Sequence, residues 1–252
     1  MERNGIELKN HDDDEVERIL TEAKKLEPWW FRFEIKNKAF GGVVPRETEK
    51  VDLFLKWAEL LGIRIESVLE LGSHEGSHSE QIARCPNVNR VVGLEGREDN
   101  LARANLVKQA YKCGKVEFHK ANVEFLDPEK WGQFDAVFCA GLLHHLPKPW
   151  ELIGKLKGMC RQLLFLDTQY VQKGTSIVER YSGQWHREGT YPLSGLSTEV
   201  FWLDFKELLL LLMENGFEVR FIRDYEDYPL GRRAFVVAQR AENVGCDWRG
   251  NR

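Results

Sequence analysis

The chain has 252 residues, of which 42% are hydrophobic and 30% charged, and its formal net charge at pH 7 is -4. This length and composition allow one domain with a full core and flanking segments. Lysine and arginine form no basic patch along the chain. Because phosphate neutralisation needs clustered cations, the composition disfavours a large nucleic-acid interface. An acidic run at residues 11–17, "HDDDEVE", predicts the solvated beginning of a helix.

The cysteines and the apolar runs bear on the compartment. The five cysteines are Cys85, Cys113, Cys139, Cys160 and Cys246. Their odd number and the lack of a C-x-x-C spacing indicate free thiols in a reducing compartment. The N-terminus is charged, without the apolar stretch of a signal peptide, and the run "LLLLLM" at 208–213 is too short to span a bilayer. We therefore expect a cytoplasmic protein with no membrane partner.

Short apolar runs alternate with amphipathic stretches through the middle of the chain. Strands are expected at residues 67–71, 90–95, 115–121, 134–140 and 162–167. Helices are expected at residues 76–85, 98–113 and 149–160. Strands that are apolar almost throughout and are separated by helices predict a parallel sheet covered on both faces. The predicted fold class is α/β with a doubly wound sheet.

The C-terminal part departs from this alternation. A helix is predicted at 204–216, with Gly216 as its C-cap. Two further strands, 217–225 and 233–240, follow with only the turn "EDYPLG" between them, and this spacing predicts an antiparallel hairpin. Five parallel strands and the hairpin together make a mostly parallel sheet of seven strands.

The stretch "ELGSHEG", Glu70 to Gly76, is a glycine-bearing turn between a predicted strand and a predicted helix. It does not match the G-x-G-x-x-G fingerprint of nicotinamide-binding folds. It resembles the first motif of S-adenosylmethionine-dependent methyltransferases, Asp/Glu-x-G-x-G-x-G, with Glu70, Gly72 and Gly76 in register and His74 in place of the middle glycine. The resemblance implies the Rossmann-like class I methyltransferase fold and S-adenosyl-L-methionine as the cofactor. For this motif alone, the alternative is an ordinary turn of an α/β fold.

The resemblance also implies roles for the residues of this turn. Gly72 lets the backbone pass close under the methionine part of the ligand, where a Cβ would collide. Glu70, at the strand end, sets the local field for the ammonium group of the ligand. Ser73 and Gly76 complete the set of cofactor contacts expected from the turn.

The second and third strands also end in candidate cofactor contacts. Glu95 closes the second strand, where a carboxylate can accept both ribose hydroxyls as a bidentate partner, and Gly96 follows it. After the third strand the family usually carries an acidic residue for the adenine amino group. Here Asn122 offers an amide oxygen, and Val123 offers its backbone N–H to the ring.

The fourth strand leads into "CAGLLHHLPKPWELI", residues 139–153. This stretch resembles the G-x-L-x-H-L-x-x-P segment of small-molecule methyltransferases and of the tRNA wobble-uridine carboxymethyl branch. Ala140 and Gly141 leave room there for the amino-acid end of the ligand. That branch carries tyrosine in place of His144, which disfavours a carboxylated cofactor.

His144 and His145 are candidates for a general base. Methyl transfer needs a base only when the acceptor is a hydroxyl or a protonated amine, and imidazole titrates in the useful range. The alternative is that one of the two histidines caps a loop by hydrogen bonding. No metal site is predicted, because no Asp or Glu stands at a helical spacing that would complete one.

Residues 170–200 form a long segment with few regular signals. It leaves from the carboxyl end of a strand, the edge where ligands bind in doubly wound folds, and inserts of this length are usually functional. We expect it to close over the methyl acceptor, with Arg180, Tyr181 and Arg187 as substrate contacts. Candidates for an aromatic pocket wall are Trp29, Trp30, Tyr181, Trp185 and Trp202, with core packing as the alternative for each.

The expected organisation is a helical and aromatic N-terminal segment at 1–62, a methyltransferase domain at 63–240 and a tail at 241–252. The resemblance implies methyl transfer from S-adenosylmethionine to an oxygen or nitrogen atom of a small molecule. Two alternatives stay open: a non-catalytic adenosyl-binding regulatory domain, and a tRNA-modifying methyl- or carboxymethyltransferase. The sequence identifies neither the acceptor nor the oligomeric state.

Overall fold

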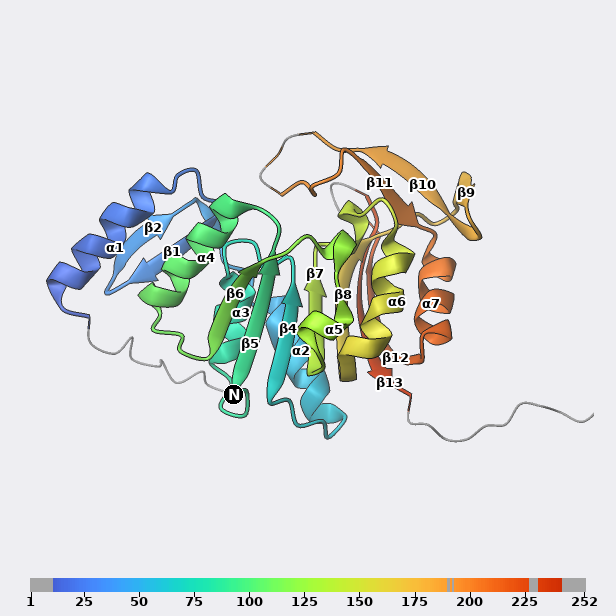
Figure 1. The fold of residues 1–252 in the computed structure, drawn as a ribbon, viewed down its shortest axis with the longest axis horizontal. Helices are drawn as coiled ribbons and strands as arrows, with labels where there is room; N and C mark the ends of the chain where they lie inside the picture. The colour runs from blue at the N-terminus through green and yellow to red at the C-terminus, as the bar shows by residue number, and fades with distance from the viewer. Residues whose placement is uncertain (1–10, 190, 192, 227–230, 242–252) are drawn as a thin grey trace, which may run out of the picture. The chain divides into compact units, whose positions relative to one another are not determined.

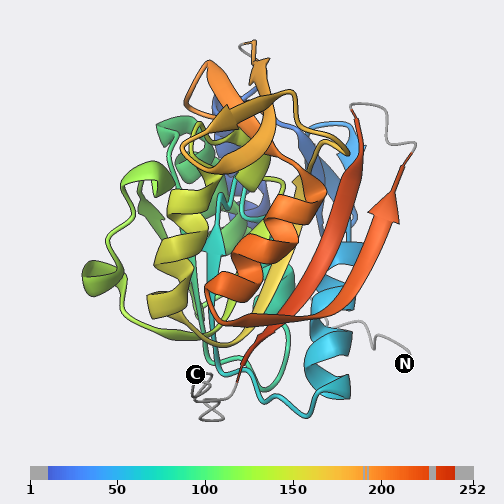
Figure 2. The same ribbon diagram turned by 90° about the vertical axis from the view of Figure 1, so that its right-hand side faces the viewer.

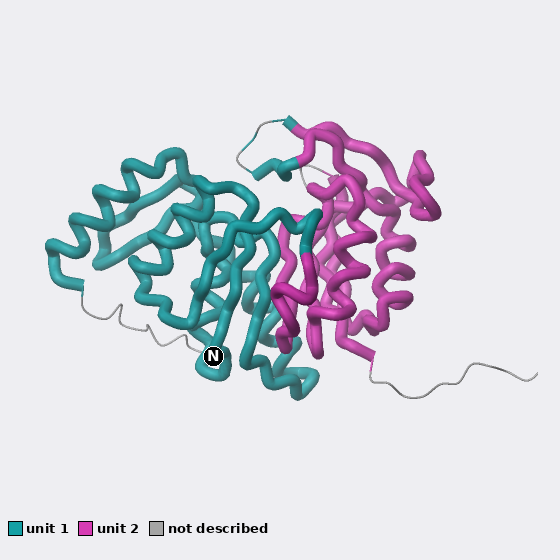
Figure 3. Tube along the Cα trace, viewed as in Figure 1, with its two compact units in different colours: residues 1–126, 189–196 teal, residues 127–188, 197–252 magenta. Residues whose placement is uncertain are grey.

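The structure is a computed structural model that describes residues 11–189, 191, 193–226 and 231–241. The chain divides into two compact units (Figure 3). Unit 1 comprises residues 1–126 and 189–196, and unit 2 comprises residues 127–188 and 197–252. The boundary at residue 126 falls inside the segment 63–240 that we expected as one domain. Cys246, all but the first residue of the expected tail and most of the "EDYPLG" turn lie outside the described residues.

A seven-stranded sheet forms the centre of the fold and confirms the predicted α/β class (Figure 1). Its strand order is β12-β13-β8-β7-β4-β5-β6. The strands are β4 (Ser67–Leu71), β5 (Arg90–Glu95), β6 (Val116–Lys120), β7 (Phe134–Ala140), β8 (Cys160–Gln169), β12 (Phe217–Tyr225) and β13 (Arg233–Arg240). All seven were predicted, and β8 extends beyond its predicted limits at both ends.

In unit 1, β4 pairs in parallel with β5, and β5 with β6. Val68, Leu69 and Leu71 are fully buried, as expected of strands covered on both faces, where nearly every side chain must be apolar. The helices are α2 (Glu49–Leu60), α3 (Ser77–Ala83) and α4 (Glu98–Ala110), followed after β6 by the 3-10 turn η1 (Val123–Phe125).

The N-terminal part of unit 1 contains a small sheet that the sequence analysis did not predict. The predicted helix is α1 (Asp13–Lys25), and the Asp12 side chain caps it by accepting a hydrogen bond from the backbone of Glu15. The strands β1 (Phe31–Ile35), β2 (Lys38–Gly41) and β3 (Val44–Pro45) follow in the order β2-β1-β3. Phe33 and Phe40 stack with ring centroids 5.5 Å apart, and they join α1 and α4 in one apolar cluster. Trp29, Phe33 and Phe40 of this segment therefore form core.

In unit 2, β7 and β8 are parallel, and β13 and β12 add antiparallel strands beside β8, as predicted. The helices are α5 (Pro128–Trp131), α6 (Pro149–Met159) and α7 (Phe205–Glu214), and a 3-10 turn η2 (Leu143–His145) follows β7. Figure 2 shows α6 and α7 side by side next to the β12–β13 hairpin. The C-cap of α7 is Asn215, and the predicted Gly216 follows it with a φ of 76°.

Residues 170–200 were expected to hold little regular structure, and this expectation was wrong. The strands β9 (Ser176–Val178), β10 (Tyr181–Arg187) and β11 (Glu199–Leu203) form a separate antiparallel sheet in the order β11-β10-β9. Gly183, which reads as a loop signal, marks a close backbone approach instead, because a Cβ there would lie 2.3 Å from the carbonyl oxygen of Trp202. Among the helices that the structure describes, none is both long and apolar enough to cross a bilayer.

Candidate functional site

The glycine turn at the carboxyl end of β4 is held against β5. The backbone N–H groups of Gly72 and Ser73 both donate to the carbonyl of Leu94, at 2.9 and 3.0 Å. Gly72 has a φ of 72° and Gly76 a φ of 78°, a region that L side chains rarely adopt. A Cβ on Gly76 would also lie 2.7 Å from the ring of Phe118, so packing inside unit 1 requires this glycine.

Ser73 and Glu70 occupy different positions around the turn. Ser73 is buried, and its Oγ has no hydrogen-bond partner among the residues that the structure describes. A buried hydroxyl without a partner in a glycine turn fits contact with a polar ligand. The Glu70 carboxylate is also buried, but it contacts the Ser79 hydroxyl and lies 3.2 Å from Nδ1 of His78, so it holds the beginning of α3.

Glu95 presents a rigidly held carboxylate at the carboxyl end of β5. It accepts the backbone N–H groups of His74, at 2.8 Å, and of Arg97, at 2.9 Å. The Asn100 side chain approaches the same carboxylate at 3.5 Å. Of the roughly four lone-pair sites of a carboxylate, the two backbone bonds and the long Asn100 contact engage three, so one site is free, and displacement of Asn100 would free a second for the two hydroxyls of a ribose. This geometry fits an adenosyl ligand.

The residues after Glu95 contact a remote segment of unit 1. A Cβ on Gly96 would lie 2.6 Å from the Leu196 side chain. The Arg97 guanidinium donates to the carbonyl of Gly195 at 3.0 Å and to that of Tyr191 at 3.3 Å. Tyr191, Gly195 and Leu196 therefore lie against the end of β5, and Arg97, which holds the first two, was not among the candidate residues.

Asn122 and Val123 lie beyond the carboxyl end of β6. The Asn122 amide oxygen accepts the backbone N–H of Glu124 at 3.0 Å and so caps the 3-10 turn η1. The oxygen expected to meet an adenine amino group is thus already engaged, although it retains a second lone pair. Val123 is buried.

Sequence reasoning missed Glu75, which stands inside the glycine turn. Its carboxylate is buried and accepts the backbone N–H groups of Trp30 and Phe31. Burial raises the pKa of Glu75, and the two backbone hydrogen bonds oppose that rise. The side chain thereby ties the N-terminal segment of unit 1 to the turn.

In unit 2, Ala140 ends β7 and Gly141 turns the chain away from it. Gly141 has a φ of 73°, and its N–H donates to the carbonyl of Asp167 at 2.8 Å. The buried Asp167 carboxylate binds the Arg233 guanidinium through two hydrogen bonds, of 2.5 and 2.6 Å. A Cβ on Gly141 would lie 3.3 Å from Nη2 of Arg233. This charge pair therefore stands directly beside the turn.

The two adjacent histidines of η2 have different environments. Nδ1 of the buried His144 accepts the backbone N–H of Gln169 at 3.2 Å. An acceptor at Nδ1 means that the proton of a neutral His144 ring is on Nε2. His145 instead directs Nδ1 at the carboxylate of Glu188, and the side chains of this pair are 16% and 13% exposed.

Glu188 was not among the candidate residues, yet it completes a histidine–carboxylate pair. An ionised carboxylate only accepts hydrogen bonds, so Nδ1 of His145 is the donor. The neutral ring then keeps its lone pair on Nε2, which is the arrangement of a general base oriented by a carboxylate. The two residues are 43 positions apart in the chain, and no local pattern connects them.

The side chains that were predicted to contact the substrate have other partners in unit 2. Arg180 forms a bidentate ion pair with Glu214 of α7, and Arg187 pairs with Glu199 of β11. The Tyr181 ring stacks on Trp150 of α6 with centroids 4.8 Å apart. The structure does not bring these three side chains together with His145.

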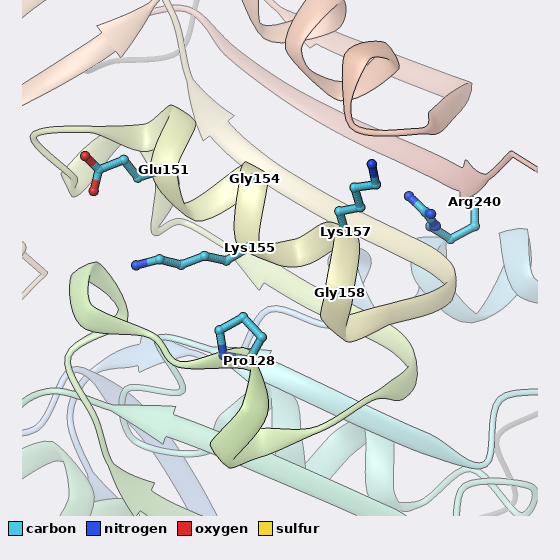
Figure 4. A pocket seen from close by; sticks show the side chains of 7 residues that line it. All are labelled: Pro128, Glu151, Gly154, Lys155, Lys157, Gly158 and Arg240. Atoms are coloured by element: carbon cyan, nitrogen blue, oxygen red, sulfur yellow. The ribbon is translucent and has the colours of Figure 1, made fainter.

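A surface cavity of about 720 Å³ lies in unit 2, near the amino ends of β7 and β8 (Figure 4). It is lined by Pro128, Glu151, Gly154, Lys155, Lys157, Gly158 and Arg240. Gly158 precedes the beginning of β8, and Pro128 precedes β7. The cavity lining comes from α5, α6 and β13 and includes neither His144 nor His145. Among the described residues, no group of His, Cys, Asp and Glu side chains is arranged to hold a metal ion.

Comparisons with known proteins agree with this geometry. Residues 68–162 match a family model described as a methyltransferase domain. The crystal structure of the N-terminal domain of EvdMO1, in the presence of S-adenosylhomocysteine (SAH) and D-fucose, is 33% identical. It has a TM-score of 0.77, and the alignment covers 90% of this chain and 97% of that one.

Two curated relatives match over shorter stretches. A ubiquinone biosynthesis O-methyltransferase of Pseudomonas aeruginosa is 29% identical over 146 residues, which are 58% of this chain and 57% of that enzyme. One from Acinetobacter baumannii is 30% identical over 92 residues, which are 36% of this chain and 38% of that enzyme. The chain thus spans between about a third and three fifths of the length of these relatives. On the family model, the glycine turn and the EvdMO1 domain together, the chain belongs to the class I S-adenosylmethionine-dependent methyltransferase family.

Proposed function

We propose that this protein transfers a methyl group from S-adenosylmethionine to a hydroxyl oxygen of a small, polyhydroxylated acceptor such as a sugar. The observation that carries the proposal is the His145–Glu188 pair in unit 2. A neutral amine is nucleophilic without a base, and a thiol ionises readily near neutral pH, whereas a hydroxyl with its high pKa needs a base. An oriented, partly buried imidazole is therefore best explained by an oxygen acceptor.

The residues of unit 1 fit the cofactor. The Glu95 carboxylate, the Ser73 hydroxyl and the open turn at Gly72 are the groups that would hold the adenosyl ligand. S-adenosylmethionine, when bound, supplies an electrophilic methyl group on a sulfonium. Glu75 binds the backbone of Trp30, and Arg97 binds the backbone of Gly195, so both hold neighbouring segments at the carboxyl edge of the strands of unit 1. These segments help to exclude water from that edge.

His145 moves the proton in this proposal. Its Nε2 takes the proton of the acceptor hydroxyl as the oxygen becomes the nucleophile. Glu188 accepts a hydrogen bond from the Nδ1–H group throughout and stabilises the imidazolium that results, as a carboxylate does in other oriented histidine pairs. His145 is then the catalytic residue and Glu188 a positioning residue. His144, with Nδ1 already accepting a backbone N–H, supports the turn.

The relatives support an oxygen acceptor. The EvdMO1 domain was crystallised in the presence of D-fucose, a sugar whose nucleophilic groups are hydroxyls. The Pseudomonas and Acinetobacter relatives are named as O-methyltransferases. The larger identity and coverage of the EvdMO1 domain favour a sugar over the acceptors of those two enzymes.

The test is methyl transfer to a panel of acceptors that contains D-fucose, other deoxysugars, a catechol and simple amines, followed by the pH profile of the wild type. Replacing His145 with Asn should lower kcat about 10²- to 10⁴-fold, the usual contribution of a general base, and remove the rise of rate with pH. Glu188→Gln should lower kcat with SAH affinity unchanged. The matched control is Glu199→Gln, on the other face of the small sheet. Transfer only to amines, or full activity without His145, would overturn the proposal, and SAH binding without any turnover would favour a regulatory domain.

A further inference from the structure

The small sheet of unit 2 has two chemically different faces. In the pairing of β10 with β11, Gln184 lies opposite Trp202, Trp185 opposite Phe201, and His186 opposite Val200. Because side chains alternate along a strand, Gln184, His186 and Trp202 share one face. The other face carries Trp185 and Phe201 in edge contact, and Phe201 packs against Trp150 of α6. The second face therefore packs against α6.

The first face is continuous with the histidine pair. The rings of His186 and Trp202 stack with centroids 3.9 Å apart and planes inclined by 22°. The Trp202 ring also meets His144 edge to face at 5.9 Å, and His144 lies 4.1 Å from the His145 ring. Glu188, just beyond the end of β10, completes the series by contacting His145. One row of rings thus runs from His145 to His186.

Two polar atoms in this row have no partner among the described residues. They are Nε1 of Trp202 and Nε2 of His186, and both are shielded from solvent. Nearly all buried polar groups in native proteins are hydrogen-bonded, so an exception calls for an explanation. Two exceptions in stacked rings, on the face that packs against the histidine pair of η2, are best explained by a ligand that supplies the missing partners.

The chemistry of these atoms limits what that ligand offers. The indole N–H only donates, so it requires an acceptor oxygen. Burial lowers the pKa of His186, with Glu188 opposing the effect, so at neutral pH the ring is uncharged and carries one N–H and one lone pair. The pair is therefore suited to neutral oxygen groups and offers no cation to a phosphate or a carboxylate.

We propose that Trp202 and His186 determine the acceptor specificity of this protein by hydrogen bonding to an oxygen group of the acceptor that neighbours the reacting hydroxyl. The preferred acceptor is then a diol or a hydroxy ether, and an isolated alcohol is a poor one. This inference rests on the proposed O-methyl transfer. A site that hydrogen-bonds a substrate group discriminates strongly against analogues that lack it, because its own polar atoms are then left unpaired.

The test combines substrate analogues with ring-conserving variants. Trp202→Phe and His186→Phe keep an aromatic ring and remove the polar atom, and Trp185→Phe on the opposite face is the matched control. The probes are D-fucose and its singly deoxygenated analogues, each with S-adenosylmethionine. In the wild type, removal of one hydroxyl that neighbours the methylated position should lower kcat/KM roughly ten- to a hundredfold. Trp202→Phe or His186→Phe should lower kcat/KM for D-fucose by a similar factor and largely remove this preference, whereas Trp185→Phe should leave it intact.

A binding measurement separates this inference from the proposed function. With SAH at saturation, D-fucose should shift the indole ¹H–¹⁵N signal that disappears in Trp202→Phe. Transfer to D-fucose with an unchanged preference in both variants would overturn the specificity role and leave O-methyl transfer standing. A shifted signal without transfer to any hydroxyl would overturn the proposed function and support the binding role. Neither a shift nor transfer would overturn both.

Discussion

The backbone N–H of Trp30 lies 2.6 Å from a carboxylate oxygen of Glu75, and the N–H of the next residue, Phe31, lies 2.9 Å from the other oxygen. Glu75 is 1% exposed. One side chain of the glycine turn therefore satisfies two consecutive backbone donors at the beginning of β1. A buried donor that loses its partner costs about 1–3 kcal/mol, so this contact fixes the N-terminal segment of unit 1.

Glu75→Gln should destabilise the protein. The amide retains one acceptor oxygen and places an NH₂ group opposite the other backbone donor, so one of the two hydrogen bonds is lost. We expect the free energy of unfolding in urea at pH 7 to fall by about 1–3 kcal/mol. Glu22→Gln, at an exposed helical ion pair with Lys25, should change it by less than about 1 kcal/mol. Equal effects of the two substitutions would contradict this role of Glu75.

The contribution of Glu75 to the free energy of unfolding should change with pH in a defined direction. Burial raises the pKa of Glu75 above its ordinary value of 4.5. A carboxyl group with a raised folded-state pKa contributes stability that is present below the unfolded-state pKa and is lost as the pH rises through the folded-state value. The difference in unfolding free energy between wild type and Glu75→Gln should therefore shrink as the pH rises above about 4.5. A difference that grows with pH would show that the two backbone hydrogen bonds outweigh burial.

Arg97→Ala should release the segment 189–196 from the end of β5. The substitution removes the guanidinium that donates to the carbonyls of Tyr191 and Gly195. Limited proteolysis should then cleave this segment several-fold faster than in wild type, with little change in global stability. The control is Arg90→Ala, at an exposed pair with Glu117. Equal cleavage rates in wild type, variant and control would mean that contacts such as that of Leu196 with Gly96 suffice.

Glu95→Gln should weaken SAH binding. The charged carboxylate is the expected partner of the ribose hydroxyls, and hydrogen bonds to charged groups contribute about 1.5–3 kcal/mol, which corresponds to roughly ten- to a hundredfold in Kd. Calorimetric titration measures this directly. Glu117→Gln, on the exposed part of β6, should bind as the wild type does. Because Glu95 also holds the backbone of His74 and Arg97, an unchanged circular dichroism spectrum is needed to exclude a collapsed turn.

Gly183→Ala should disrupt the small sheet of unit 2. The new Cβ would lie 2.3 Å from both the Trp202 carbonyl oxygen and the Phe201 ring, so β10 and β11 must separate. Overpacking of this kind costs about 1–3 kcal/mol, and in this position it should also displace Trp202 and reduce activity. Gly114→Ala has open space around the added methyl group and should alter neither property. Wild-type stability and activity in Gly183→Ala would show that the two strands are not held this closely.

The sequence by itself determined the central sheet and the family. Each of its seven strands is a contiguous apolar or alternating run, and the first two parallel strands end in the residues of the glycine turn and in Glu95. These signals are local, because strand and helix periodicities and turn chemistry are properties of neighbouring residues. The beginning of a helix in the acidic run 11–17 was predicted for the same reason, and the structure places α1 at Asp13–Lys25 with Asp12 as its cap.

Only the tertiary structure decided which side chains contact the candidate site residues. The sequence analysis chose Arg180, Tyr181 and Arg187 from the small sheet by residue type, but their contacts are with Glu214, Trp150 and Glu199. No strand was expected in residues 170–200 or at Trp202, so the alternation of side chains that places Glu188, His186 and Trp202 on one face could not be predicted.

The pairs that define the site join residues far apart in the chain. Glu188 reaches His145 across 43 positions, and Glu75 reaches Trp30 across 45. Such contacts depend on how strands and turns pack against one another, and a periodic pattern in one segment holds no information about its partner in another. For that reason the candidate cofactor contacts, which lie in one turn and at the ends of strands, could be proposed from the sequence, and His145 could be proposed as one of two candidate bases, whereas its orienting carboxylate, Glu188, was identified only in the folded structure.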